Sequence, residues 1–126
     1  MKKELFATLT IIALIIGAIV NVIHLKTMVT DMEHHINRAS QACASGQFTD
    51  ATNALEQALT LWLDADGYTH MFLRHSEIDT ATDAFYDAMN SLRGGDAPGA
   101  TSALEKLSYH LQSILSMEYV TLRSIF

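Results

Sequence analysis

Residues 5–23 read LFATLTIIALIIGAIVNVI, and this stretch decides the architecture of the chain. Fifteen of its nineteen residues are apolar, and none is charged. A helix rises about 1.5 Å per residue, so the run would span about 28 Å, close to the hydrocarbon thickness of a bilayer. We therefore predict a transmembrane helix, with residues 1–26 forming a cytoplasmic stub and a membrane anchor.

A secretory signal peptide also combines a basic start with an apolar run, so the residues after the run must separate the two interpretations. Cleavage needs small residues in an A-x-A-like pattern just after the apolar core. Val22, Ile23 and Leu25 lie in this region, and their side chains are too large. The pattern favours an uncleaved anchor, and it leaves a cleaved signal or a buried helix of a soluble protein as alternatives.

The charges that flank the run predict its orientation. Lys2, Lys3 and the amino terminus outweigh Lys26 on the other side. The positive-inside rule then places the N-terminus in the cytoplasm, which makes the chain a single-pass protein of the cell membrane with residues 27–126 outside. Because so little chain would remain inside, any signal passed inward requires a partner.

The segment 27–126 is acidic. It holds all of the 14 Asp and Glu residues except Glu4, and all of the 8 Lys and Arg residues except Lys2, Lys3 and Lys26, which leaves 13 acidic against 5 basic side chains. This balance argues against nucleic acid and anionic lipid headgroups as partners. The segment is long enough for one small domain, and its single cysteine excludes an internal disulfide.

Apolar residues in this domain recur every three or four positions, which is the spacing of amphipathic helices. No helix breaker separates the first stripe from the membrane run, so we expect the anchor and the first bundle helix to form one rod. The rod should continue to about Ser45, where Gly46 ends it. The residues of its stripe are Leu25, Met28, Met32, Ile36, Ala39 and Cys43.

A second helix is predicted after this turn. It could continue through Gly67 to Phe72 and Leu73, although a glycine inside the helix also permits a break there. The residues of its stripe are Phe48, Ala51, Leu55, Ala58, Leu59 and Trp62.

Two more helices follow, each with a residue that can cap its N-terminus. Ser76 is predicted to cap the third, which should end at Gly94 and Gly95, and Asp96 is predicted to cap the fourth, with Pro98 in its opening turn. The third stripe is Ile78, Ala81, Phe85, Met89 and Leu92, and the fourth is Ala100, Leu104, Leu107, Leu111, Ile114 and Leu115.

An internal repeat supports a fold of two hairpins. Residues 46–56 read GQFTDATNALE and residues 95–105 read GDAPGATSALE, with six of eleven positions identical. Chance or shared helix-start chemistry is the alternative explanation. We predict an all-α protein in which the transmembrane helix continues into an antiparallel four-helix bundle, built from two helical hairpins in residues 27–126.

The densest charged group in the domain is acidic. Glu77, Asp79, Asp83 and Asp87 follow one another on the third predicted helix, and the last three are spaced four apart, which puts them on one face. Like charges at this spacing repel one another. The group is either a solvated face or a surface for a cation or a basic partner.

Histidines and the tail supply the other candidates. His75 precedes the acidic group, but the sequence offers it no nucleophile partner and no recognised metal-ligand spacing. We therefore predict no enzymatic activity, no metal and no cofactor. Ile125 and Phe126 either pack against the base of the bundle or contact the membrane or a partner.

Several of these features together resemble the domain of unknown function 4363 family of Firmicute bacteria. The resemblance rests on the basic start, the single anchor, Trp62, the junction at residues 75–79 (HSEID) and the terminal Ile125-Phe126. The family pattern has His-x-Glu-Ile-Asp at the junction and Asn-Ile-Phe near the end, where this chain carries Ser124. The resemblance implies a small membrane-anchored helical protein of unassigned activity. It also implies a membrane partner, because members are often encoded beside multi-pass proteins of the domain of unknown function 421 family.

These observations favour a single-pass protein whose extracytoplasmic bundle binds another membrane or envelope protein. A homo-oligomer is compatible with the sequence. The alternative is a bundle that senses a small molecule or cation between its helices near Trp62, His75 and Glu77. The candidate surface consists of Trp62, His75, Glu77, Asp79, Asp83, Asp87, Ile125 and Phe126.

Overall fold

The structure, a computed structural model, describes residues 1–65, 67, 69 and 73–125. Four helices make up most of it: α1 (Lys2–Ala44), α2 (Phe48–Asp64), α4 (His75–Arg93) and α5 (Ala97–Ile125). Within the described ranges there is no strand, so the predicted all-α class is confirmed. Phe72, one of the residues to which the second helix could continue, lies outside the described residues, and α2 ends at Asp64.

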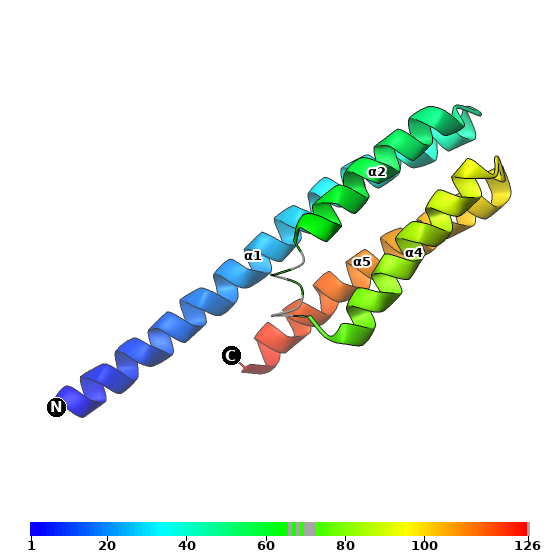
Figure 1. Ribbon diagram of the computed structural model, residues 1–126. Helices are drawn as coiled ribbons and strands as arrows, with labels where there is room; N and C mark the ends of the chain where they lie inside the picture. The colour runs from blue at the N-terminus through cyan, green and yellow to red at the C-terminus, as the bar shows by residue number, and fades with distance from the viewer. Residues whose placement is uncertain (66, 68, 70–72, 126) are drawn as a thin grey trace.

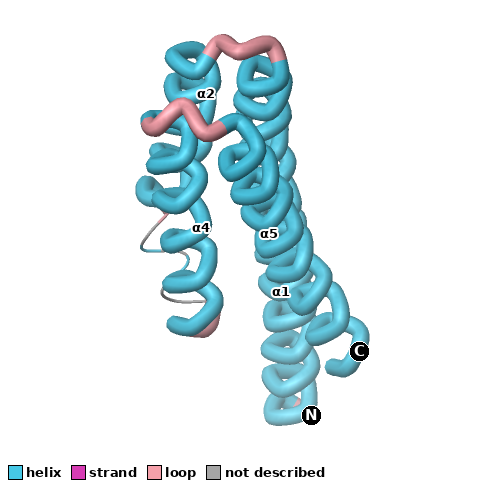
Figure 2. Tube along the Cα trace, turned by 90° about the vertical axis from the view of Figure 1, so that its right-hand side faces the viewer, coloured by secondary structure: helices cyan, strands magenta, loops and turns pink. Residues whose placement is uncertain are grey.

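The helices form two antiparallel hairpins that pack side by side (Figure 1). α1 pairs with α2, and α4 pairs with α5. The hairpins join through contacts of α1 with α5 and of α2 with α4, which closes a ring of four helices. Figure 2 shows the two connecting turns at the same end of the bundle, far from the N-terminus. The predicted bundle of two helical hairpins is confirmed.

The two hairpin turns have the same backbone geometry, which explains the internal repeat. Gly46 has a φ of +75° and Gly95 has a φ of +68°, a region that side chains with a Cβ disfavour. The Gly46 N–H donates to the Cys43 carbonyl and the following N–H to the Ala42 carbonyl, at 3.1 and 2.9 Å. The second turn repeats this pattern one hairpin later. Both are Schellman motifs, so the repeat encodes one way of ending a helix and starting the next.

The helix starts differ from one another in their capping. Asp96 caps α5 as predicted, because its Oδ1 accepts the Gly99 N–H at 3.1 Å. A Cβ on Gly99 would collide with the Asp96 carboxylate, so the glycine makes room for the cap. The predicted cap at Ser76 is wrong: α4 starts one residue earlier, and Arg74 takes the N-cap position without a side-chain bond. Ser76 already lies in the first turn, where its carbonyl accepts the Thr80 hydroxyl at 2.7 Å.

The core is a single apolar cluster that all four helices share. α4 and α5 bury every residue of their predicted stripes. Met28, Phe48 and Leu59 of the first two stripes are only partly buried, while Val22, Val29, Ala54 and Ala88 join the core. The added alanines are too small to stand out in a stripe of large apolar residues, so the periodicity of the sequence did not reveal them.

α1 is one uninterrupted helix of 43 residues, about 65 Å long. Its buried residues begin only at Val22 and continue to Cys43. Before Val22 most side chains are exposed, including Leu9, Leu14 and Val20. Within the described residues, α1 is the one helix that is long and apolar enough to cross a membrane. The predicted rod, from the apolar run to the Gly46 turn, is confirmed.

Candidate interaction site

A groove between α4 and α5 gathers charged side chains of both signs. Asp83 and Asp87 of α4 line one side, and Lys106 and His110 of α5 line the other. Thr80 and Ser102 add hydroxyls, and the groove has a volume of about 420 Å³. The wall between them consists of small residues (Ala84, Gly99 and Ala103). Such a groove can accept polar and charged groups of a partner, because it offers acceptors and donors a few residues apart.

The four predicted acidic residues divide into two groups. Asp83 and Asp87 line the groove, while Asp79 lies exposed on the same helix and Glu77 is half-buried in the first turn. Glu77 is favourably placed there, since a carboxylate near a helix N-terminus interacts well with the helix dipole. His75 is the exposed first residue of α4, and it takes part in an interaction. Of the three residues spaced four apart, Asp83 and Asp87 line the groove and Asp79 does not, and the spacing did not show what faces them.

Lys106 and His110 are the groove residues that the sequence analysis missed. They are spaced four apart on α5, as Asp83 and Asp87 are on α4. Asp83 lies 11 residues before Gly94 and Lys106 lies 10 residues after Asp96, so the antiparallel hairpin brings these two to the same level, and all four side chains line one groove. The spacing of Lys106 and His110 is visible in the sequence, but only the register of the hairpin shows that they lie across from the acidic pair.

Trp62 is a core residue. Its side chain is 3 % exposed, and its ring stacks on Phe85 with ring centroids 6.3 Å apart. The indole N–H donates to the Thr82 hydroxyl at 2.9 Å, and that hydroxyl donates to the Ile78 carbonyl at 2.8 Å. The buried polar atom of the ring is thus satisfied, and Trp62 joins α2 to α4 rather than facing a partner.

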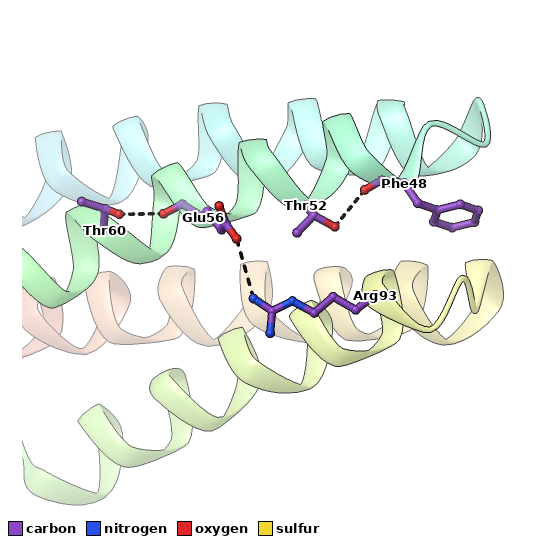
Figure 3. Close-up of polar contacts among 5 residues, drawn as sticks. All are labelled: Phe48, Thr52, Glu56, Thr60 and Arg93. Atoms are coloured by element: carbon purple, nitrogen blue, oxygen red, sulfur yellow. Dashed lines mark hydrogen bonds and ion pairs between the residues drawn. The ribbon is translucent and has the colours of Figure 1, made fainter.

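Polar contacts near the surface also join α5 to α1 and α4 to α2. The Ser108 hydroxyl of α5 lies 2.7 and 2.8 Å from the two carboxylate oxygens of Glu33 on α1. Arg93 of α4 reaches across to Glu56 of α2, with 3.7 Å between Nη2 and Oε1 (Figure 3). Both side chains of this ion pair are exposed, so it adds little to stability.

A second groove lies where α5 returns along the apolar part of α1. It is lined mostly by apolar residues, with Asn21 of α1 and Glu118 and Thr121 of α5 as polar exceptions. Partial burial raises the pKa of the Glu118 carboxyl above 4.5, because burial disfavours its charged form. Ile125 is the last residue of α5, and Phe126 lies outside the described residues. The backbone of Ile125 therefore belongs to the helix that ends beside the apolar run.

A third groove, between α1 and α2 near their turn, is lined mostly by polar side chains, among them Arg38, Gln41 and Asp50. No group of three or more His, Cys, Asp or Glu side chains in the described part of the chain is placed to hold a metal ion. The buried Cys43 thiol points to the Ala97 carbonyl at 3.9 Å, which makes it part of the packing between the two turns.

Comparison with known families gives one match. The model of the family described as "Domain of unknown function (DUF4363)" matches residues 19–125. The chain belongs to this family. The match covers the whole bundle of this DUF4363 protein, whereas residues 1–18, which hold most of the apolar run, lie outside it. No curated protein and no solved structure gives a significant match.

Proposed function

We propose that this DUF4363 protein is a single-pass membrane protein whose bundle binds another membrane or envelope protein on the outer side of the cell membrane. The observation that carries the proposal is the continuity of α1, which passes from an exposed apolar half into the core of the bundle without a break. A rigid helix fixes the height and rotation of the bundle above the bilayer. A neighbour in the same membrane then meets one defined face.

The groove between α4 and α5 is the face that we assign to this partner. Its acidic side chains lie on α4 and its basic side chains lie on α5, so a partner needs matching charges of both signs, which favours a protein surface over an anionic lipid layer. The domain is acidic, which disfavours nucleic acid. The proposed role is non-enzymatic and needs no cofactor. A multi-pass protein of the domain of unknown function 421 family is the partner that the sequence resemblance implies, and a second copy is compatible with the same face.

Photo-crosslinking in native membranes tests this assignment. A benzophenone amino acid replaces Asp87 in the groove, and the matched control replaces Gln57, which is exposed on α2. We expect a specific adduct with a membrane or envelope protein from position 87 and none from position 57. The charge reversal Asp83→Lys should abolish the adduct, because it opposes the partner's charges. Equal adducts from both positions, or none from either, would contradict the proposal.

The side of the membrane on which the bundle lies requires a separate measurement. Tyr109 is exposed on α5, so a Tyr109→Cys variant in a Cys43→Ala background presents one accessible thiol. A membrane-impermeant maleimide should label this thiol in intact cells. Labelling only after the cells are broken open would show that the bundle lies in the cytoplasm.

A further inference from the structure

The exposed apolar surface of α1 overlaps with the part of α1 that α5 covers on one side. Buried residues of α1 start at Val22, yet Ile19, Val20 and Ile23 at the same level are each about half exposed. These side chains need an apolar environment on the faces that α5 leaves open. The hydrocarbon zone must therefore reach the level of Ile23.

The length of the run leads to the same level. Residues 5–23 match the hydrocarbon thickness, with Lys2 and Lys3 just before the run and His24 and Lys26 just after it. Shifting the bilayer toward the N-terminus would bury Lys2 and Lys3 and expose Val20 and Ile23. The outer boundary of the hydrocarbon thus lies close to residue 23.

α5 ends below this boundary. It returns along α1 and stops beside the N-terminal half of that helix in both views (Figures 1 and 2). Glu118, Thr121 and Leu122 line one groove with α1 residues as far down as Ala13, and Ala18 is half-buried. Ala18 lies five residues below Ile23, which is about 8 Å along the helix axis.

The side chains at the end of α5 suit this depth. Val120 is 57 % exposed, and Met117 and Tyr119, which are close to it in the sequence, are exposed as well. Tyrosine favours the boundary between headgroups and hydrocarbon, where its ring is apolar and its hydroxyl reaches water. Arg123 in the last turn is exposed, and its long side chain can extend to lipid phosphates or to the last carbonyls of the helix.

We propose that the end of α5, from Met117 onward, is inserted into the outer leaflet of the membrane that α1 crosses, so that bilayer lipid covers Met117, Tyr119 and Val120. The occupant of this face is lipid because the face continues the exposed apolar surface of α1 at the same depth. The bundle then enters the bilayer at two points, through α1 and through the end of α5. This inference rests on the proposed membrane anchor and is independent of the partner.

The test uses the full-length chain reconstituted alone in vesicles of phosphatidylcholine and phosphatidylglycerol. In a Cys43→Ala background, single cysteines carry the fluorophore NBD at Val120, at Tyr109 or at Ile12. Tyr109 is the matched control because it is 71 % exposed on the same helix, about 16 Å farther from the membrane. Ile12 lies exposed inside the apolar run and reports on the anchor itself. Unchanged Trp62 emission shows that each variant is folded.

We expect lipids with a nitroxide near the headgroup end of the acyl chain to quench NBD at position 120, lipids with a nitroxide near the terminal methyl group to quench it at position 12, and aqueous iodide to quench it at position 109. Quenching by iodide at position 120 with lipid quenching at position 12 would overturn the inference and leave the anchor intact. Iodide quenching at all three positions would overturn both the inference and the proposed membrane anchor. Protection at position 120 that disappears when the vesicles hold less protein would show that a second copy, not lipid, covers the face.

Discussion

The two halves of α1 belong to one unbroken helix but have opposite surfaces. From Leu5 to Val20 the helix is mostly apolar on every side and almost wholly exposed, whereas from Val22 to Cys43 it buries a single apolar stripe and presents mostly polar residues elsewhere. A helix that is apolar all round needs an apolar surrounding, and an amphipathic helix needs packed neighbours. The helical backbone is the same in both, so the side-chain pattern alone decides which surrounding each half requires.

The largest expected effect concerns insertion into the membrane, which should depend on the apolar half of α1. A Leu9→Asp/Ile12→Asp variant places two charges in the exposed apolar half. Each should cost about 3 kcal/mol for insertion near the bilayer centre, so the protein should be released from membranes by alkaline carbonate extraction. A Leu9→Ala/Ile12→Ala control should stay in the membrane. Retention of the charged variant would show that this half is not a membrane anchor.

A second pair of variants separates the halves by packing. Leu25 is fully buried in the bundle half, and Leu9 is 56 % exposed in the apolar half. Leu25→Ala should lower the free energy of unfolding by about 2–5 kcal/mol, because it removes core contacts and leaves a cavity. Leu9→Ala should leave it nearly unchanged. Denaturant unfolding in mild detergent, followed through Trp62 fluorescence, measures both, and equal losses would contradict the comparison.

Two glycines, one inside α1 and one at its end, give a smaller difference. Gly46→Ala should lower the unfolding free energy by about 1–2 kcal/mol, since the turn requires a positive φ. Gly17 lies inside the helix, and a Cβ at this position would meet no neighbouring atom, so Gly17→Ala should cause no loss. The same unfolding experiment compares them. A loss at Gly17 as large as at Gly46 would mean that another helix packs closely on the apolar half.

The smallest effect concerns Glu118, which lies where the two halves of α1 meet. Its pKa is raised in the folded chain, so folding carries no penalty from this group below about pH 4.5, where it is protonated in both states. As the pH rises through the raised pKa, stability should fall slightly and then level off. Glu118→Gln should remove this step. Unfolding curves at several pH values test it, and a step of the same size in the variant would assign it to another group.

The helices and their buried stripes were predictable because the signal is local. In α4 and α5 every predicted stripe residue is buried, since hydrophobic spacing directly reflects which face can leave water. The start of α4 was misplaced at Ser76, because a serine near a helix start can either cap the helix or occupy its first turn. The choice depends on the backbone before it, which the residue type does not specify.

The site was harder to predict because it depends on pairs of distant residues. Trp62 was expected near a binding surface, but Thr82 and Phe85 on another helix make it a core residue. Asp83 and Asp87 were identified, while Lys106 and His110 became visible only when the hairpin placed α5 against α4. A carboxylate pattern on one helix cannot show whether a base, water or a cation faces it.

The sequence by itself determined the four helices of the described residues, the two glycine turns and the division of α1 into an apolar and an amphipathic half. Each of these follows from the chemistry of residues within a few turns of one another. Only the tertiary structure decided that α5 returns to lie beside the apolar run and that acidic and basic side chains line one groove. Those arrangements depend on how the two hairpins pack, which is set by contacts between residues far apart in the chain.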